Sequence, residues 1–274
     1  MATKLENSAA RELAGLLAGR KVLDLTALLS PEYPAATAIG VPFLRHPFNF
    51  YNGVTPAYCG TYADHILILN EHTGTHFDAP PHLIPDVTRY PDLPNAASIG
   101  AQTAEQVEVQ RFMGPADVID VTDLIGTAAA GSSPVITVER VKQWEGQHGQ
   151  IEAGDVVLFY TSWMDRYYKR FPEGYALDLH PRWYGKMEGW AAPDADTVTY
   201  IVDKGVKCLG FDTVSTGTIQ DDAPPHIAAL SRGTVLVEKL IGLGQLPARG
   251  AFFMFLPLKV ERGTGSPGRA IAIV

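Results

Sequence analysis

Three histidines and one aspartate crowd into a short segment in the first third of the chain, where the sequence reads EHTGTHFDAPPH. Imidazole nitrogen and carboxylate oxygen together form a ligand set that suits zinc, manganese or iron. The glycine and the prolines of this segment disfavour a continuous helix. A strand that ends in a tight turn brings the four side chains together instead, and these are His72, His76, Asp78 and His82.

Such crowding has a physical cost when no cation compensates it. Burying these groups costs several kcal/mol each, or forces protonation. A bound divalent ion removes that cost, so the segment predicts a metal centre. The competing interpretation is a polar surface loop that happens to be rich in histidine, which fits a lone histidine better than this density of ligand types.

A complete site requires donors from elsewhere, and three candidates lie in the C-terminal third. Glu238 is a carboxylate in the otherwise apolar strand expected at 234–240, so it faces solvent, pairs with a cation or binds metal. His226 follows the turn-forming run at 221–225, where an ordinary loop histidine is the simpler interpretation. Gln220 offers a neutral amide oxygen, which is a weaker indication.

Composition limits the classes of partner. The chain has 274 residues, of which 46% are hydrophobic and 19% charged, and its formal net charge is −8. This is a globular balance without a basic cluster for nucleic acid or an anionic membrane. No apolar run approaches the ~18 residues that a membrane-spanning helix needs. The two cysteines, Cys59 and Cys208, indicate reduced thiols and a cytoplasmic protein.

Strands outnumber helices and the two are mixed, which predicts one α/β or α+β domain over residues 1–274, built on a large sheet or barrel-like core, with residues 1–20 as a helical extension. Long loops are expected at 27–60, and an irregular aromatic region at 162–193. Helices are expected to begin near Thr103, Thr137 and either Asp194 or Asp196, and strands are predicted at 21–25, 65–69, 116–121, 155–160, 206–211, 234–240, 251–258 and 270–274.

The histidine segment resembles a long and specific family signature. His72-Thr-Gly-Thr-His-Phe-Asp-Ala-Pro-Pro-His82 matches the pattern His-x-Gly-Thr-His-x-Asp-x-Pro-x-His of the cyclase family, which includes bacterial kynurenine formamidase and isatin hydrolase. The likeness covers most of the chain and is weakest at 27–60 and 162–193. It extends to Asp24-Leu-Thr26, Gly210-Phe-Asp-Thr-Val-Ser215, Phe255-Leu-Pro-Leu-Lys259 and Gly265-Ser-Pro-Gly-Arg269.

The resemblance implies a swivelling β/β/α domain with a mixed, barrel-like β core and flanking helices. It implies a metal-dependent hydrolase that forms a homodimer or homotetramer. In this pattern His72, His76 and Asp78 bind metal, and His82 binds a second ion or acts as general acid and base.

The resemblance leaves the metal and the number of ions open. In the formamidase pattern, His226 and Glu238 complete a dinuclear zinc site. In the isatin hydrolase pattern, Gln220 takes the ligand position of a single-manganese site. Because this chain carries both sets of residues, Mn²⁺ and Zn²⁺ both remain candidates, with one or two ions per subunit.

Hydrolysis is the chemistry that this ligand set supports best. A divalent cation lowers the pKa of bound water toward ~7, and the resulting hydroxide attacks a carbonyl carbon. We expect His82 to carry a proton from the water to the leaving nitrogen, with His226 as the second candidate for that role. Redox chemistry at a single iron is a less favoured use of the same ligands.

Aromatic residues in the two loop regions could stack on a planar substrate, or pack against each other and at a subunit interface. The first interpretation predicts a small aromatic or cyclic amide as substrate, with a lactone or ester as the alternative. The candidate substrate-binding residues are Phe43, Phe50, Tyr51, Trp163 and Trp183.

Two rival classes need a test. A homologue that binds metal without catalysis would keep the same ligands. A cysteine-dependent hydrolase is disfavoured because neither Cys59 nor Cys208 has a neighbouring histidine in the sequence. A serine hydrolase is disfavoured because the sequence has no Gly-x-Ser-x-Gly segment.

Overall fold

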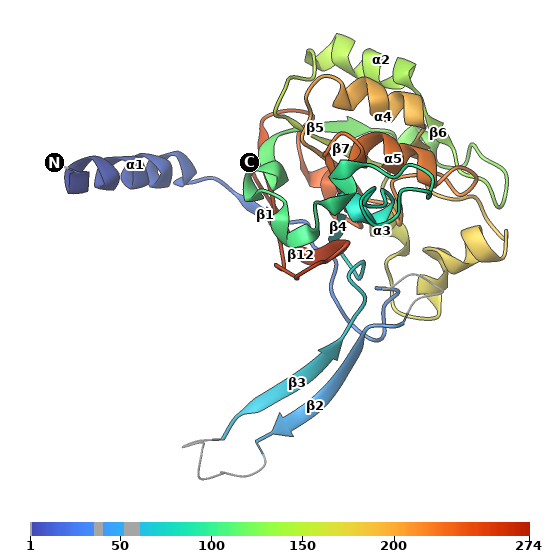
Figure 1. Ribbon diagram of the computed structural model, residues 1–274, viewed down its shortest axis with the longest axis horizontal. Coiled ribbons are helices and arrows are strands. Elements are labelled where there is room, and N and C mark those ends of the chain that lie inside the picture. Colours follow the sequence, from blue (N-terminus) through green and yellow to red (C-terminus); the bar gives the residue numbers. More distant parts are fainter. Residues whose placement is uncertain (1, 36–40, 52–60) are drawn as a thin grey trace.

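The computed structural model describes residues 2–35, 41–51 and 61–274. Within them, eight strands form one mixed sheet, and a further pairing of β12 with β4 closes seven of these strands into a barrel, with β1 added beside β12 (Figure 1). This confirms the expected barrel-like β core. In sheet order the strands are β1 (Val22–Asp24), β12 (Gly265–Ile273), β11 (Ala251–Pro257), β5 (Met113–Asp120), β7 (Val156–Tyr160), β9 (Cys208–Phe211), β10 (Val235–Glu238) and β4 (His76–Asp78).

Four neighbouring barrel strands, β5, β7, β9 and β10, run parallel. Parallel neighbours need long crossover connections, and here these carry α2 (Val138–His148), α4 (Ala195–Val202) and α5 (Ala223–Leu230) across one side of the barrel (Figure 1). Because parallel strands end at the same edge, residues that follow β7, β9 and β10 come close together. A fourth parallel pair, β6 (Val135–Ile136) with β8 (Ala192–Pro193), lies in these connections.

Alternation along the strands divides the core into two layers. In β7, Val156 and Leu158 belong to the cluster inside the barrel, whereas Val157 and Phe159 belong to the cluster between the barrel and the helices. This follows from the two-residue period of strand side chains. Each fully buried side chain of this size contributes about 1.5–3 kcal/mol relative to its exposed state.

The helix ends that the sequence predicted are present. Oδ1 of Asp194 accepts a hydrogen bond of 2.8 Å from the main-chain nitrogen of Thr197 and so caps α4. Helix α2 begins after Thr137 and ends at Gly149, whose φ of 95° breaks the helix.

Helix α5 was not predicted, because its first residues read as a turn. Pro224 and Pro225 lie in its first turn. Main-chain N–H groups in the first turn have no acceptor within the helix, so a proline there loses no hydrogen bond. The consequence is functional, since His226 stands on a helix and not in a loop.

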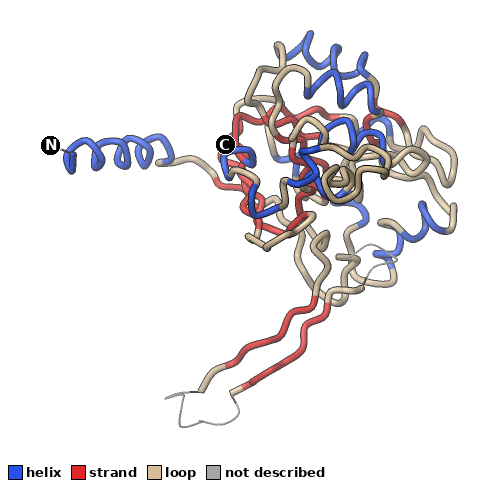
Figure 2. Tube along the Cα trace, viewed as in Figure 1, coloured by secondary structure: helices blue, strands red, loops and turns tan. Residues whose placement is uncertain are grey.

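A two-stranded hairpin projects from the barrel (Figures 1 and 2). It consists of β2 (Leu44–Phe50) and β3 (Ala63–Ile68), which pair antiparallel. The expectation of loops throughout 27–60 is therefore wrong at 44–50, and the strand expected at 65–69 lies on the hairpin and not in a buried sheet. The large exposed apolar residues of this hairpin arm are Leu44, Phe48, Phe50, Ile66, Leu67 and Ile68.

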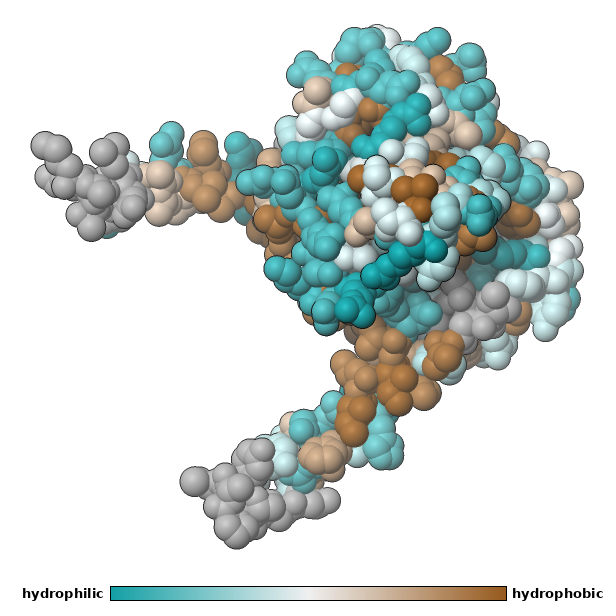
Figure 3. Space-filling view, viewed as in Figure 1, coloured by the Kyte–Doolittle hydropathy of each residue, from teal (hydrophilic) through white to brown (hydrophobic). Residues whose placement is uncertain are grey.

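Helix α1 (Ala2–Leu17) extends away from the barrel (Figure 2). Leu13, Leu16 and Leu17 are exposed on it, and apolar surface is visible both here and along the hairpin arm in Figure 3. Among the described residues, no helix has the length and apolar character to cross a membrane.

Candidate metal centre

Two strands place His76 and Glu238 opposite each other. β4 and β10 pair antiparallel, and in this register His76 is the partner of Glu238. Nε2 of His76 lies 3.6 Å from Oε2 of Glu238 and 3.5 Å from Oδ1 of Asp78. His76 and Asp78 share a face of β4 because they are two residues apart.

Asp78 belongs to two groups of potential metal ligands. The outer group is His72, Asp78 and His82, and the inner group is His76, Asp78 and Glu238, each with its donor atoms within 4.8 Å of one another. Asp78 is only 1% exposed, whereas His82 reaches the surface. The ring centres of His72 and His82 are 4.1 Å apart. The centre is therefore closed on its inner side and open to solvent at His82.

His226 joins the inner group from α5. Its Nε2 lies 3.1 Å from Oε1 of Glu238 and 3.7 Å from Oδ2 of Asp78. The structure thus brings together six of the seven residues that the sequence predicted as ligands, which are His72, His76, Asp78, His82, His226 and Glu238.

Hydrogen bonds fix which ring nitrogen of two histidines faces the other donors. Nδ1 of His76 donates to the carbonyl of Gly74 at 2.8 Å, and Nδ1 of His226 donates to the carbonyl of Asp222 at 2.7 Å. A carbonyl oxygen only accepts, so both Nδ1 atoms carry the hydrogen. Nε2 is therefore the ring nitrogen that His76 and His226 could offer to a metal ion.

The carboxylates of the centre favour positive charge on two of its histidines, whereas burial favours the neutral form of His76 and His82. Burial lowers the pKa of His226, but the hydrogen bond and the charge of Glu238 outweigh burial and raise this pKa to about 9. In His72, burial is likewise outweighed by Asp78, and the pKa is raised. Burial dominates in His76 and holds its pKa well below the usual range.

One carboxylate oxygen shows that these residues fit a metal ion. Oδ2 of Asp78 is buried and has no hydrogen-bond partner among the described residues. A buried carboxylate oxygen without a partner is costly, and a divalent cation between the two ligand groups removes that cost. Nitrogen and oxygen donors in this number suit Mn²⁺ or Zn²⁺.

The side chain of Gln220 is hydrogen-bonded to the main chain of Ser133 in this structure. Its Nε2 donates to the main-chain oxygen of Ser133 at 2.9 Å, and its Oε1 accepts from the main-chain nitrogen of Ser133 at 2.9 Å. The side-chain oxygen of Gln220, which was predicted as a metal ligand, therefore accepts a hydrogen bond from the main chain. Gln220 could bind a metal ion only if its hydrogen bonds to Ser133 were broken.

The predicted substrate-binding aromatics separate into different environments. Trp163, at the start of α3 (Trp163–Tyr167), is fully buried and donates through Nε1 to the carbonyl of Leu177 at 3.0 Å, so it packs in the core. Phe50 and Tyr51 are exposed on the hairpin arm, with ring centres 5.3 Å apart. Phe43 is buried, and Trp183 is 46% exposed.

Two residues that support the centre were not predicted from the sequence. The main-chain nitrogen and Oγ1 of Thr216 both donate to Oε1 of Glu238, at 2.6 and 2.9 Å. Lys239 is only 1% exposed, and its Nζ donates to the carbonyl of His72 at 3.2 Å. The position of Lys239 inside an otherwise apolar strand was the only sequence feature that could have indicated its role. The sequence around Thr216 has no feature that indicates a role.

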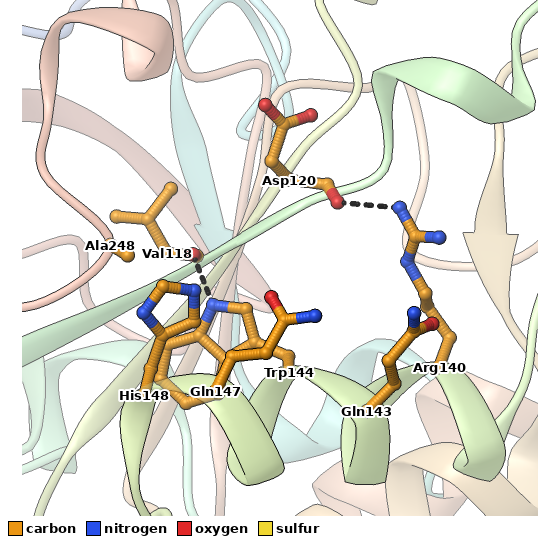
Figure 4. Close-up of a pocket in the computed structure, with 8 residues that line it drawn as sticks. All are labelled: Val118, Asp120, Arg140, Gln143, Trp144, Gln147, His148 and Ala248. Carbon is orange, nitrogen blue, oxygen red and sulfur yellow. Dashed lines mark hydrogen bonds between the residues drawn. The ribbon is translucent and has the colours of Figure 1, made fainter.

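Two surface cavities in the described part of the chain lie away from the ligand groups. A cavity of about 170 Å³ lies between α2 and β5, where Nε1 of Trp144 donates to the carbonyl of Val118 (Figure 4). A larger one, of about 570 Å³, lies at the base of the hairpin arm beside Leu28 and Leu67. Neither is lined by a residue of the two ligand groups, so the ligand groups and not these cavities locate the site.

Comparisons with known proteins agree with this geometry. The Cyclase family model matches residues 23–218, more than half of the chain. The chain is 32% identical to isatin hydrolase of Roseibium aggregatum over 273 residues, which cover 95% of each protein. It is 30% identical to kynurenine formamidase of Salinibacter ruber over 212 residues, or 75% of this chain and 77% of that one.

Solved structures show the same fold. Isatin hydrolase A of Labrenzia aggregata, solved with benzyl benzoate, superposes with a TM-score of 0.76 and 28% identity over 97% of this chain and 99% of that one. An isatin hydrolase bound to the product analogue thioisatinate superposes with a TM-score of 0.74 and 27% identity over 100% of this chain and 98% of that one.

The barrel and its two ligand groups, together with these relatives, define a metal-dependent hydrolase of amide carbon–nitrogen bonds. The chain belongs to the cyclase family.

Proposed function

We propose that this chain opens a small aromatic or cyclic amide of the isatin type, or an aryl formamide, by adding water across the carbon–nitrogen bond. The observation that carries the proposal is Asp78, a buried carboxylate shared by two ligand groups with one oxygen lacking a hydrogen-bond partner. The identity to isatin hydrolase along 95% of the chain supports the cyclic amide within this class.

The residues of the centre have different roles in the proposed reaction. A divalent cation, when bound, lowers the pKa of water and polarises a carbonyl group. His76, His226 and Glu238 hold the buried side of the centre, and Thr216 fixes the orientation of Glu238. His82, which reaches the surface, takes a proton from water and returns it to the leaving nitrogen, so the products are a carboxylic acid and an amine.

The metal is proposed as Mn²⁺ or Zn²⁺, with up to two ions per subunit. Two ligand groups that share Asp78 support two ions. The amide pair between Gln220 and Ser133 supports a centre built without Gln220.

A substrate panel tests the function. Isatin, an aryl formamide, an aryl lactone and an aryl ester are offered to protein loaded with Mn²⁺ or Zn²⁺. We expect turnover of at least one amide, with isatin preferred. Turnover of the lactone or ester alone would move the protein to the alternative class. Bound metal without turnover of any compound would identify a metal-binding homologue without catalysis.

We also propose a cytoplasmic homodimer or homotetramer with a small-molecule substrate. The hairpin arm supports self-association, because an isolated two-stranded hairpin is marginally stable and this one exposes apolar side chains such as Phe48 and Phe50. Sedimentation of the wild type and of a Phe48→Ser, Phe50→Ser variant tests this. We expect an oligomer that the variant loses, and a monomeric wild type would end the idea.

A further inference from the structure

Thr264 links His72 to a carboxylate outside both ligand groups. Oγ1 of Thr264 donates to Oε2 of Glu71 at 2.8 Å and lies 3.1 Å from Nε2 of His72. The main-chain nitrogen of Thr264 donates to the same carboxylate oxygen at 2.9 Å, and its carbonyl accepts from the nitrogen of Ala79 at 2.9 Å. Thr264 is thus held from three directions, directly before β12.

The single hydroxyl proton of Thr264 is assigned by these neighbours. An ionised carboxylate only accepts, so the proton points to Glu71. The oxygen of Thr264 is then the acceptor for His72, and Nε2 of His72 carries the hydrogen. Nδ1 in turn donates to Oδ1 of Asp78 at 2.7 Å, and it is the nitrogen that would give up its hydrogen when a cation binds between these two side chains. His72 therefore has the opposite arrangement of ring nitrogens to His76.

Gly265 keeps the imidazole of His72 in this orientation. A Cβ atom at Gly265 would lie 2.7 Å from Cε1 of His72 and 2.4 Å from the carbonyl oxygen of Phe77, closer than real contacts allow. Any side chain at this position would displace the ring from Thr264. The glycine-rich segment at 263–268 thus packs against the ligand loop, and this is a second observation that points to His72 as a held group.

We propose that Glu71 and Thr264 are positioning residues that fix the hydrogen of His72 on Nε2, so that Nδ1 is the atom offered to the metal ion. The inference rests on the proposed metal centre and deepens it. The carboxylate of Glu71 orients the hydroxyl, and the hydroxyl accepts from the ring, which makes Nδ1 a better donor to a cation. Removing such outer partners of a metal-binding histidine typically weakens metal affinity by about 10–100-fold.

Two matched pairs of variants test this proposal in full-length protein. Thr264→Val removes the hydroxyl and keeps the shape, whereas Thr264→Ser restores it. Glu71→Leu removes the acceptor, whereas Glu71→Gln keeps an amide oxygen in its place. Zn²⁺ and Mn²⁺ are titrated into chelator-stripped protein by calorimetry. We expect Thr264→Val and Glu71→Leu to bind at least one ion about 10–100-fold more weakly than wild type, and the two conservative variants to stay within a few-fold.

A spectroscopic readout separates this role from general loss of structure. Nitrogen–proton NMR of the zinc-loaded protein with labelled histidine shows which ring nitrogen carries the hydrogen, and His72→Gln assigns the signal. We expect Nε2–H for His72 in the wild type and loss of that arrangement in Glu71→Leu. If Thr264→Val fails to fold, the Glu71 pair decides.

A wild-type His72 with its hydrogen on Nδ1, or unchanged metal affinity in both disruptive variants, overturns the inference. These readouts need no substrate. These measurements could therefore disprove the positioning role without affecting the proposal of amide hydrolysis. Equally, amide hydrolysis could be disproved by the substrate panel while the positioning role is confirmed.

Discussion

His76 and Glu238 face each other across the β4–β10 pair, with Nε2 of His76 3.6 Å from Oε2 of Glu238. β4 is also the strand through which β10 and β12 complete the barrel. An ion held between these side chains therefore fastens the seam of the barrel. Metal binding and barrel stability are thus linked.

Metal removal should lower stability and activity together. A ligand that binds only the folded state at 100 times its Kd adds about 2.7 kcal/mol to the free energy of unfolding. We expect chelator-treated protein to unfold at a lower temperature in calorimetry and to lose turnover, and both to return when Mn²⁺ or Zn²⁺ is added. Full activity in protein shown to be metal-free would end the proposed mechanism.

Replacing Glu238 by glutamine tests the inner ligand group. Glu238→Gln keeps an oxygen that accepts from Thr216, but it removes the charge that attracts a cation. We expect at least one ion per subunit to be lost in elemental analysis, and kcat/KM to fall by at least 10²-fold. Glu145→Gln is the control, since Glu145 is also buried but pairs with Lys204. Wild-type metal content in Glu238→Gln would contradict its place in the ligand set.

His82 is expected to act in proton transfer. Its ring reaches the surface of the centre, beside His72. His82→Ala should lower kcat by about 10²–10⁴-fold while the metal content is retained. If the variant is purified with fewer ions than wild type, His82 is a ligand instead.

Asp212 should make stability depend on pH. It follows β9, is fully buried, and its Oδ1 accepts from the main-chain nitrogen and Oγ1 of Thr161 at 2.8 and 2.7 Å. Burial raises its pKa to about 7 from 3.8, so the folded state favours the neutral carboxyl group. The free energy of unfolding should therefore fall as pH rises from about 4 to about 7, and the Asp212 contribution should then level off.

Asp212→Asn should remove that part of the pH dependence. Urea unfolding at several pH values measures it, with the exposed Asp196→Asn as the control that keeps the wild-type slope. The same slope in wild type and Asp212→Asn would show that Asp212 is not its source.

Cys208 should have no part in the reaction. It is buried inside the barrel, and burial raises the pKa of its thiol. Cys208→Ala should keep wild-type turnover and lose about 1 kcal/mol of stability, because a buried group is removed. Loss of turnover in a folded, metal-loaded Cys208→Ala protein would favour the cysteine-dependent class. Cys59 lies outside the described residues, and turnover of a Cys59→Ala variant tests in the same way whether this second cysteine takes part in the reaction.

The ligand loop could be predicted because its residues are close in the sequence. His72, His76 and Asp78 fall within seven positions, and strand alternation with one turn is enough to bring them together. Glu238 was open to three interpretations from alternation alone. Its metal-facing orientation depends on the pairing of β10 with β4, which is a long-range contact.

The outer support of the centre could not be predicted. Thr264 contacts His72 across 192 positions, and threonine in a glycine-rich run has no pattern that indicates such a role. Helix α5 was hidden because proline indicates a turn in most contexts, although the first turn of a helix accepts it. The aromatic predictions relied on residue type, which does not distinguish the buried Trp163 from the exposed Phe50.

The closure of the barrel by its last strand has a consequence for biosynthesis. β12 holds the final residues of the sheet, and Thr264 directly precedes it. The ribosome makes this segment well after the histidine loop, so a nascent chain carries the loop long before its counterpart exists. The centre should accordingly acquire its ion only after β12 has been made, with the histidine loop exposed to cellular chelators until then.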